Sequence, residues 1–304
     1  DSGAAIQLSS ILLFIVAFLF FLEKYFNQNK RFSFSKNSKL VSLIRPDNST
    51  KFLIYLICLI PIVLAFVIPV LFNLSNIFSS FDDINFERLL NLTFNSFTIS
   101  LISSVLILVV STFFLYNEKI SNSKIYYYIN QFISLGYSIP GAVVALAVVL
   151  SVTGLDNLND SIKFLGSFSV YFLILIYAYI IRFMAVGKSP IKSSMEKYPD
   201  SYNSSAKNLG LSNFKIFQKI YFPINKYAFF TALTLVFVDI MKELPITLIL
   251  RPFNFDTLAT QTYEFAIEEM IPLSSIYSSV IIIICCILLI FLKMFLDKSN
   301  VFRN

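Results

Sequence analysis

The residues best placed to do chemistry are three charged side chains, Asp239, Lys242 and Glu243, at the end of a long apolar run. Their spacing of three and four residues puts them on one face of a helix, where opposite charges can pair. An ionisable group in or beside a membrane-spanning segment marks a functional site by default. One interpretation is a functional site in the membrane whose charges exchange partners between two conformations. The alternative is a cluster at the membrane surface, with the Lys242 ammonium reaching outward.

Metal binding and acid–base catalysis have few candidates. The chain has no His, so the usual neutral-pH base and the commonest metal ligand are both missing. The three cysteines lie in apolar runs without zinc-ligand spacing and are interpreted as buried hydrophobes. Carboxylate and phenolate oxygens suit a hard metal ion, although the acidic loops that carry them are also simply solvated. We predict no catalytic residue and no metal site. The residues concerned are Cys58, Cys285, Cys286, Glu243, Asp256, Tyr263, Glu264, Glu268 and Glu269.

Seven apolar runs form the elements that must position these side chains. A spanning helix needs about 20 mostly apolar residues, and 57% of the 304 residues are hydrophobic while only 14% are charged. The runs are continuous rather than alternating, so helices are favoured over a barrel. We expect an all-α, polytopic membrane bundle with about seven transmembrane helices. The runs are Ile6–Leu22, Phe52–Phe72, Phe97–Tyr116, Ile125–Leu150, Phe164–Ile181, Tyr227–Ile240 and Ile276–Leu292.

Positive charge predicts how the chain crosses the membrane. Nineteen of the 24 Lys and Arg residues lie in the loops 23–51, 117–124 and 186–226 or after Leu292, and Arg182 is placed at the inner end of its helix. Because positive loops face the cytoplasm, the N-terminus is predicted outside and the C-terminus inside. The net charge of +6 is therefore explained by topology rather than by nucleic-acid binding.

The fourth run is broken, which is rare inside a membrane. Gly136, Pro140 and Gly141 interrupt it. Non-helical backbone at that depth survives only against protein or a water-filled cavity. The break therefore either lines a pathway or is a Pro kink packed against neighbouring helices.

The long basic loop before the sixth run contains a predicted helical hairpin, Met195–Ile224. Gly210 suits the left-handed turn that ends a helix, and the Ser212 hydroxyl can cap the next helix. Pro223 is expected to end that second helix. Its apolar stripe must be covered, by a protein or by the inner leaflet. The stripe consists of Phe214, Phe217 and Ile220.

This loop resembles the signature of importer permeases of the ATP-binding-cassette class. They carry Glu-Ala-Ala, three residues, Gly, nine residues, Ile, one residue and Leu-Pro, and the spacing matches throughout. The family's Glu falls on Ser204, which can offer only a neutral hydrogen bond. The resemblance implies that the loop is a coupling helix that docks on a cytoplasmic ATPase. The implied docking residues are Ser204, Ser205, Ala206, Gly210, Phe214, Phe217, Ile220 and Pro223.

A second resemblance, to permeases of ferric-iron importers, covers most of Gly136–Tyr263. Those proteins commonly carry Lys-Glu-Leu-Pro, Leu-Arg-Pro-Phe and Asp-Thr-Leu-Ala, which begin here at Lys242, Leu250 and Asp256. It implies ferric-iron import by alternating access across the bacterial inner membrane, with the iron held by the external binding protein. The candidate pathway or gate residues are Pro140, Gly141, Asp239, Lys242, Glu243 and Pro245.

The resemblance also implies partners and domains. The chain lacks a GxxxxGK[ST] phosphate loop, so it binds no cofactor and a partner ATPase dimer uses the ATP. The other implied partners are a periplasmic substrate-binding protein, the second permease half and the lipid bilayer. Because ferric-iron permeases commonly fuse two six-helix halves, residues 1–22 are expected to end a first half that lies upstream. Residues 23–51 then form a cytoplasmic linker, 52–296 the six-helix permease domain and 297–304 a cytoplasmic tail.

Two other function classes stay open. A secondary transporter often has broken helices in corresponding positions of two repeats, and the sequence shows one clear break without a matching second. A membrane-embedded enzyme needs a convergent nucleophile, base and metal ligands, which this composition disfavours. Within the importer class, the alternative cargoes are thiamine, a polyamine, a phosphonate or an oxyanion.

Overall fold

The computed structural model of the chain describes residues 47–121, 124–158, 168–199 and 201–301, together with isolated helical positions between residues 7 and 22. The first expected helix is described only at those positions, and the expected linker lies outside the described residues as far as position 46. Every regular element of the described chain is a helix. The predicted all-α class is therefore confirmed.

Five helical segments are each long and apolar enough to cross a membrane, and a sixth is a pair of helices bent by 114°. These six correspond to the runs expected after the linker. The spanning elements are α2 (Asn48–Ile62), a π turn (Val63–Val67) and α3 (Ile68–Ser79), α4 (Phe86–Ser121), the pair α5 (Lys124–Leu135) and α6 (Gly141–Leu158), α7 (Phe168–Met195), α10 (Phe222–Met241) and α13 (Ile271–Val301). The short elements are 3-10 turns at Phe81–Asp83 and Gly136–Ser138, α8 (Ser201–Asn208), α9 (Asn213–Ile216), a π turn (Phe217–Tyr221), α11 (Pro245–Leu250) and α12 (Leu258–Ile267).

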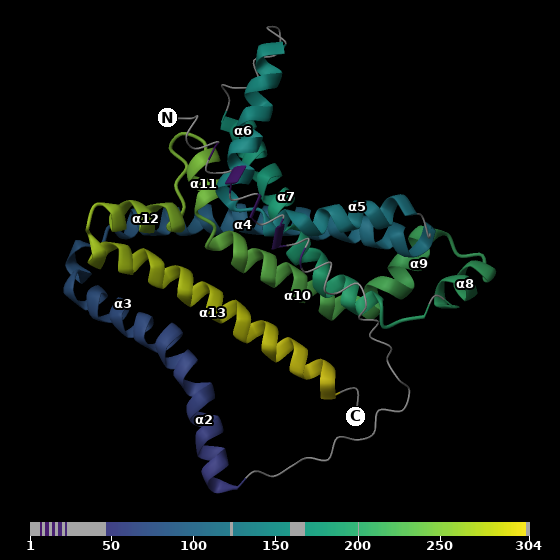
Figure 1. Cartoon of the computed structure of the whole chain (residues 1–304), viewed down its shortest axis with the longest axis horizontal. Helices are drawn as coiled ribbons and strands as arrows, with labels where there is room; N and C mark the ends of the chain where they lie inside the picture. Colours follow the sequence, from purple (N-terminus) through teal and green to yellow (C-terminus); the bar gives the residue numbers. More distant parts are fainter. Residues whose placement is uncertain are drawn as a thin grey trace.

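Helices α4, α7 and α10 pack on one another and form the centre of the bundle (Figure 1). Small residues let membrane helices approach closely, and both α4 and α7 supply them. At Gly187 of α7, an added Cβ would lie 3.0 Å from the Ile107 side chain of α4, so the two helices touch here because Gly has no side chain. The buried serines of α4 are Ser96, Ser100, Ser103, Ser104 and Ser111.

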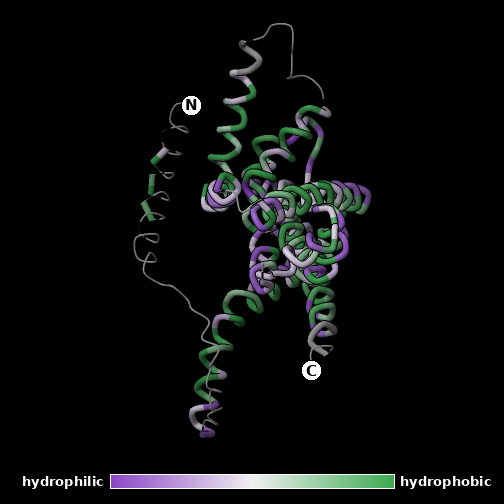
Figure 2. Tube along the Cα trace, turned by 90° about the vertical axis from the view of Figure 1, so that its right-hand side faces the viewer, coloured by the Kyte–Doolittle hydropathy of each residue, from purple (hydrophilic) through white to green (hydrophobic). Residues whose placement is uncertain are grey.

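The outer helices leave large apolar faces uncovered. Helix α13 packs on α3, α10 and α12, while α6 packs on α11 and α7. In Figure 1, α2 and α6 point away from the centre in opposite directions, and Figure 2 shows both as largely hydrophobic. In the most apolar part of the Asn48–Ser79 span, no residue is buried within the chain. Faces of this kind need lipid or another membrane protein around them.

Helix α7 differs from the sequence-based prediction in its end point and in the place of Arg182. The sequence predicts a helix that ends at Ile181 with Arg182 at its inner end, whereas α7 continues to Met195 and Arg182 lies at its middle. Polar residues do not end this helix, and some of them are packed against protein. Lys188, for example, is only 4% exposed.

Candidate functional sites

The hairpin between α7 and α10 is built around Gly210. Helix α8 ends in two backbone hydrogen bonds, from Gly210 N to Lys207 O (2.9 Å) and from Leu211 N to Ala206 O (3.2 Å). This pair is the Schellman arrangement, which requires a left-handed residue after the helix. Gly210 has φ +76°, so the sequence-based prediction of a left-handed turn is confirmed.

The inner face of the hairpin is packed onto the bundle. Ala206 and Ile216 are buried with Met195 and Phe229 in one apolar cluster, and Leu211 packs against it. The Tyr116 hydroxyl of α4 donates a hydrogen bond to Asn213 O over 2.5 Å. The hairpin is therefore joined to the ends of α4, α7 and α10.

The predicted docking residues divide between this packed face and the surface. Ser204, Ser205 and Phe214 are exposed, but Ala206 is buried, and Phe217 and Ile220 pack partly against the cluster. Leu209, which is not among the predicted docking residues, is 80% exposed at the tip, and Phe214 is 66% exposed. The apolar surface left for a partner is thus formed mainly by Leu209 and Phe214. Leu209 could have been found from its place next to the turn Gly.

Two local expectations about the second helix are wrong. Ser212 precedes α9, but its hydroxyl makes no capping hydrogen bond. Pro223 does not end the helix, because α9 runs through the π turn into α10 and the span continues from Asn213 to Met241. The π turn bonds Phe222 N to Phe217 O. Pro223 is the second residue of α10, directly after the π turn, so the helix continues past a residue that has no N–H to donate.

The predicted break in the fourth run separates α5 from α6. Pro140 favours an extended residue before it, and Ile139 has φ −81° and ψ 129°. An added Cβ at Gly136 would collide with the Ile181 carbonyl oxygen, and one at Gly141 would lie 2.7 Å from Glu243 Oε1. Both glycines therefore let the break approach α7 and the segment after α10. The result is a break packed against protein.

A second break follows α10, contrary to the expectation of a single one. Helix α10 ends at Met241, and Pro245 opens α11. Glu243 lies between them and is 7% exposed, and its Oε1 accepts a hydrogen bond from Ile246 N over 3.2 Å. Tyr179 and Thr247 share a hydrogen bond of 2.6 Å that ties α11 to α7.

Arg182 connects the two breaks. Its Nε lies 3.8 Å from Glu243 Oε2, and its Nη1 donates to Ile139 O over 3.5 Å. Arg182 Nε is buried and has no hydrogen-bond partner in the described part of the chain. Burial raises the pKa of the Glu243 carboxyl, and the Arg182 guanidinium opposes that rise. The pair is therefore held by charge more than by hydrogen bonding.

The three charges expected on one helical face do not act as one cluster. Lys242 Nζ lies 2.9 Å from Asp239 Oδ1, as the spacing predicts. The hydrogen bond to Asp239 raises the pKa of the Lys242 ammonium. Glu243 instead turns toward Arg182, because α10 ends before it.

Two cavities follow α7 from this region toward the hairpin. One of about 560 Å³ lies between α5, α7 and α10 and is lined in part by Tyr137, Lys188 and Asp239. The other, of about 700 Å³, lies between the ends of α7, α10 and α13. They share Pro190 and Ser193, so they are neighbours along one face of α7.

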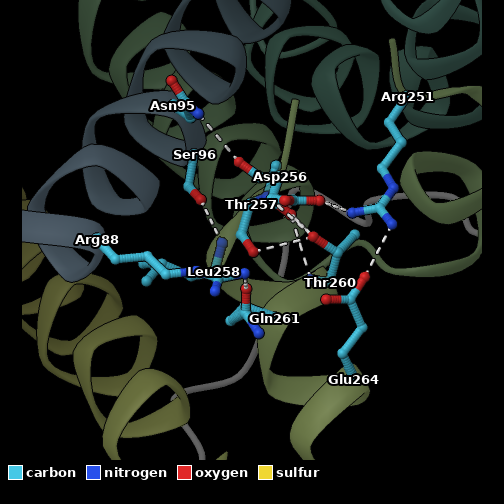
Figure 3. Close-up of polar contacts among 10 residues, drawn as sticks. All are labelled: Arg88, Asn95, Ser96, Arg251, Asp256, Thr257, Leu258, Thr260, Gln261 and Glu264. Carbon is cyan, nitrogen blue, oxygen red and sulfur yellow. Dashed lines mark hydrogen bonds and ion pairs between the residues drawn. The ribbon is translucent and has the colours of Figure 1, made fainter. Parts of the chain in front are cut away.

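At the opposite end of the bundle, a polar network holds the segment 251–264 against α4 (Figure 3). Arg251 pairs with Asp256 and, over 2.8 Å, with Glu264. Thr257 and Thr260 form a reciprocal capping box at the start of α12. Three contacts reach α4: Asn95 Nδ2 donates to Asp256 O, Ser96 Oγ accepts from Leu258 N, and Arg88 donates to Gln261. Asp256 and Glu264 are thus occupied by Arg251, and Glu268 and Glu269 are exposed nearby.

Sequence comparison places this architecture among known transport proteins. The family described as the binding-protein-dependent transport system inner membrane component matches residues 119–300. The Fe(3+)-transport system permease protein FbpB 2 of Haemophilus influenzae (strain ATCC 51907 / DSM 11121 / KW20 / Rd) is 24% identical over 214 residues. That match covers 70% of this chain but only 40% of the length of the relative.

Two solved structures share the fold. A bacterial ABC transporter involved in the import of the acidic polysaccharide alginate has a TM-score of 0.63 at 13% identity, covering 82% of this chain and 96% of that one. The bacterial alginate ABC transporter in complex with an alginate pentasaccharide-bound periplasmic protein has a TM-score of 0.62 at 15% identity, covering 80% and 93%. At identities this low, the similarity shows a shared fold and nothing more. The family match covers more than half of the chain, which therefore belongs to the binding-protein-dependent transport system inner membrane components, a family of membrane permeases and not of enzymes.

Proposed function

We propose that this chain forms one membrane-spanning half of an ATP-driven, binding-protein-dependent importer of ferric iron. The single observation that carries the importer mechanism is the hairpin, which is packed onto three spanning helices and presents an apolar tip. Support for iron comes from the 24% identical relative, whose name specifies Fe(3+) transport. The Lys-Glu-Leu-Pro, Leu-Arg-Pro-Phe and Asp-Thr-Leu-Ala motifs support it further.

The hairpin is the proposed contact with the ATPase dimer. Leu209 and Phe214 would enter a cleft on the ATPase, while Ser204 and Ser205 would supply neutral hydrogen bonds beside them. Because Ala206, Gly210, Ile216 and the π turn join this tip to α7 and α10, a movement of the ATPase would be passed on to both helices as one body. Pro223 has no backbone N–H, so it would be compatible with the π turn that connects the hairpin to α10.

The gate is proposed at the meeting of the two helix breaks. Pro140 and Gly141 on one side and Glu243 and Pro245 on the other have Arg182 between them. Short non-helical segments can change shape without unfolding a helix, and a charge pair without a direct hydrogen bond is easily exchanged. Asp239 and Lys242 would provide the alternative partners as the pathway opens and closes.

The proposed orientation puts the hairpin and the C-terminal tail in the cytoplasm and the N-terminus outside. The segment 251–264 would then lie on the outer side, where the periplasmic binding protein delivers its cargo. A second permease half would cover the apolar faces of the outer helices. Residues 1–22 are proposed as the last helix of such a half, followed by a linker over 23–51, a permease domain over 52–296 and a tail over 297–304.

The test is uptake of ⁵⁵Fe(III) by a bacterial cell that lacks its own ferric permease. The cell would carry the complete gene with its ATPase and binding protein, and Gly210→Pro would be the matched loss-of-coupling control. We expect ATP-dependent uptake that Gly210→Pro abolishes, since Pro cannot adopt φ +76°.

Two outcomes would contradict parts of the proposal. If the ATPase co-purifies with the chain but no iron enters, the importer class stands and the ferric assignment is wrong. If uptake and ATPase association both survive Gly210→Pro, the hairpin is not the coupling element.

A further inference from the structure

The two cavities along α7 form a groove with an excess of positive charge. Their charged lining residues are Lys188, Lys192, Glu196 and Asp239 in one cavity and Lys197 and Lys226 in the other. We call this surface the lysine groove. It runs from the neighbourhood of the gate, at Asp239, to the ends of the helices that carry the hairpin.

Both carboxylates of the lysine groove already have cationic partners. Asp239 is paired with Lys242 at 2.9 Å, and Glu196, just after α7, lies 3.8 Å from Lys192 in the last turn of that helix. Within residues 47–121, 124–158, 168–199 and 201–301, no ion pair neutralises Lys188, Lys197 or Lys226. Among the described residues, these three lysines thus have no carboxylate at ion-pair distance.

Lys188 is the most constrained of these residues. It is 4% exposed, and its Nζ donates to Asn130 O and, over 2.6 Å, to Ser134 Oγ. The nearest carboxylate in this polar chain is Glu118, which accepts from Asn130 Nδ2 and so reaches Lys188 only through an amide. An ammonium has three donors. With two of them used, the third remains for a molecule in the groove.

Fixed positive charge in a confined groove attracts anions and repels cations. The hydroxyl groups of Ser189 and Ser193 line the same groove and can donate to oxygen atoms, whereas the Ser134 hydroxyl already donates to Asn130 O. A bare trivalent cation would meet the wrong sign of charge over this stretch, whereas an oxygen-rich anion would be matched by both the lysines and the hydroxyls.

We infer that the lysine groove is an anion-selective stretch of the transport pathway, with Lys188 as its specificity-determining residue. This rests on the proposed import function and narrows its cargo class. The transported species is a metal chelate with net negative charge, or an oxyanion, and not a bare Fe(III) ion.

The charge of the groove can be measured without transport. The three native cysteines are replaced by serine, and Ser189→Cys places a single thiol beside Lys188 in the assembled importer. Its reaction rates are compared for two methanethiosulfonate reagents of opposite charge, one bearing a sulfonate and one a trimethylammonium group. Ser79→Cys, exposed at the end of α3 and away from both the hairpin and the groove, is the control position.

We expect the ratio of the two reaction rates, sulfonate over trimethylammonium reagent, to be on the order of tenfold higher at Ser189→Cys than for a free thiol. Lys188→Gln should reduce that ratio about fivefold. Lys188→Gln should leave the ratio at Ser79→Cys unchanged. A preference equal to that of the free thiol, no effect of Lys188→Gln, or failure of both reagents to reach Ser189→Cys would overturn the inference.

A transport arm separates the cargo charge from the function itself. Proteoliposomes with ATPase and binding protein are supplied with ⁵⁵Fe-labelled ferric citrate. An anionic cargo predicts that Lys188→Gln lowers the initial uptake rate by about tenfold, while Lys188→Arg retains most of it. Uptake by Lys188→Gln that equals or exceeds the unsubstituted rate would overturn the inference. Absence of iron uptake by the unsubstituted importer would count against the ferric assignment, and the thiol measurement would then decide the groove charge alone.

Discussion

Arg182 Nε lies 3.8 Å from Glu243 Oε2, which brings the middle of α7 against the break that follows α10. Glu243 is 7% exposed, so its carboxylate has little water to stabilise it if the guanidinium is removed. Removing one member of a buried pair leaves the other charge uncompensated, which costs about 3–5 kcal/mol.

The first prediction is therefore that Arg182→Met destabilises the folded protein by about 3 kcal/mol or more. The double variant Arg182→Met with Glu243→Leu should recover most of this loss, because no buried charge remains. Thermal unfolding of the purified, detergent-solubilised chain measures both. Equal melting temperatures for the single and double variants would show that the pair is not coupled.

The glycines of the first break should respond very differently to an added methyl group. Gly136→Ala places a Cβ against the Ile181 backbone carbonyl, which cannot move aside as a side-chain tip could. We expect a loss of about 1–3 kcal/mol and a displaced break. Gly154→Ala is the matched control, since a Cβ there meets no atom within 4 Å and glycine is already unfavourable inside helix α6. Unfolding temperatures that rank the two variants in the opposite order would contradict the packing of this break.

The spanning segments and the turn of the hairpin could be predicted because their signals are local. Apolar runs long enough to cross a bilayer have few alternatives to a spanning helix. The position of Gly210 follows from one turn that needs a positive φ. The class of the protein could therefore be predicted from the sequence.

The second break and the lysine groove could not be predicted in this way. Lys242 and Glu243 continue a helical spacing pattern, and only the packing of Glu243 against Arg182 shows that the helix has ended. The sequence predicts Lys188 in the loop 186–226, yet it lies within α7 and is held by Asn130 and Ser134 from another helix. Both features depend on contacts between distant segments, which composition and periodicity do not report.

The tip of the hairpin offers a test that separates docking from folding. Leu209→Asp changes a side chain that is 80% exposed, so the stability of the chain should change by no more than about 0.5 kcal/mol. If Leu209 enters an apolar cleft on the ATPase, the charge should sharply reduce co-purification of the ATPase and ATP-dependent uptake. Leu209→Met keeps the apolar contact and should preserve both. Unchanged ATPase association with Leu209→Asp would remove Leu209 from the interface.

The network at the other end of the bundle predicts a local effect on α12. Arg251 pairs with both Asp256 and Glu264, so Arg251→Met leaves two carboxylates without their cation beside the capping box of Thr257. We expect hydrogen exchange over residues 251–264 to report a local opening free energy lowered by about 1–2 kcal/mol. Arg251→Lys should recover only part of the lost opening free energy, because a compact ammonium cannot contact Asp256 and Glu264 together as a guanidinium does. Glu268→Gln is the matched control, since it removes an exposed carboxylate outside the network. Exchange that is as slow in Arg251→Met as in the unsubstituted chain would mean that the contacts with Asn95 and Ser96 of α4 hold this segment without the ion pairs.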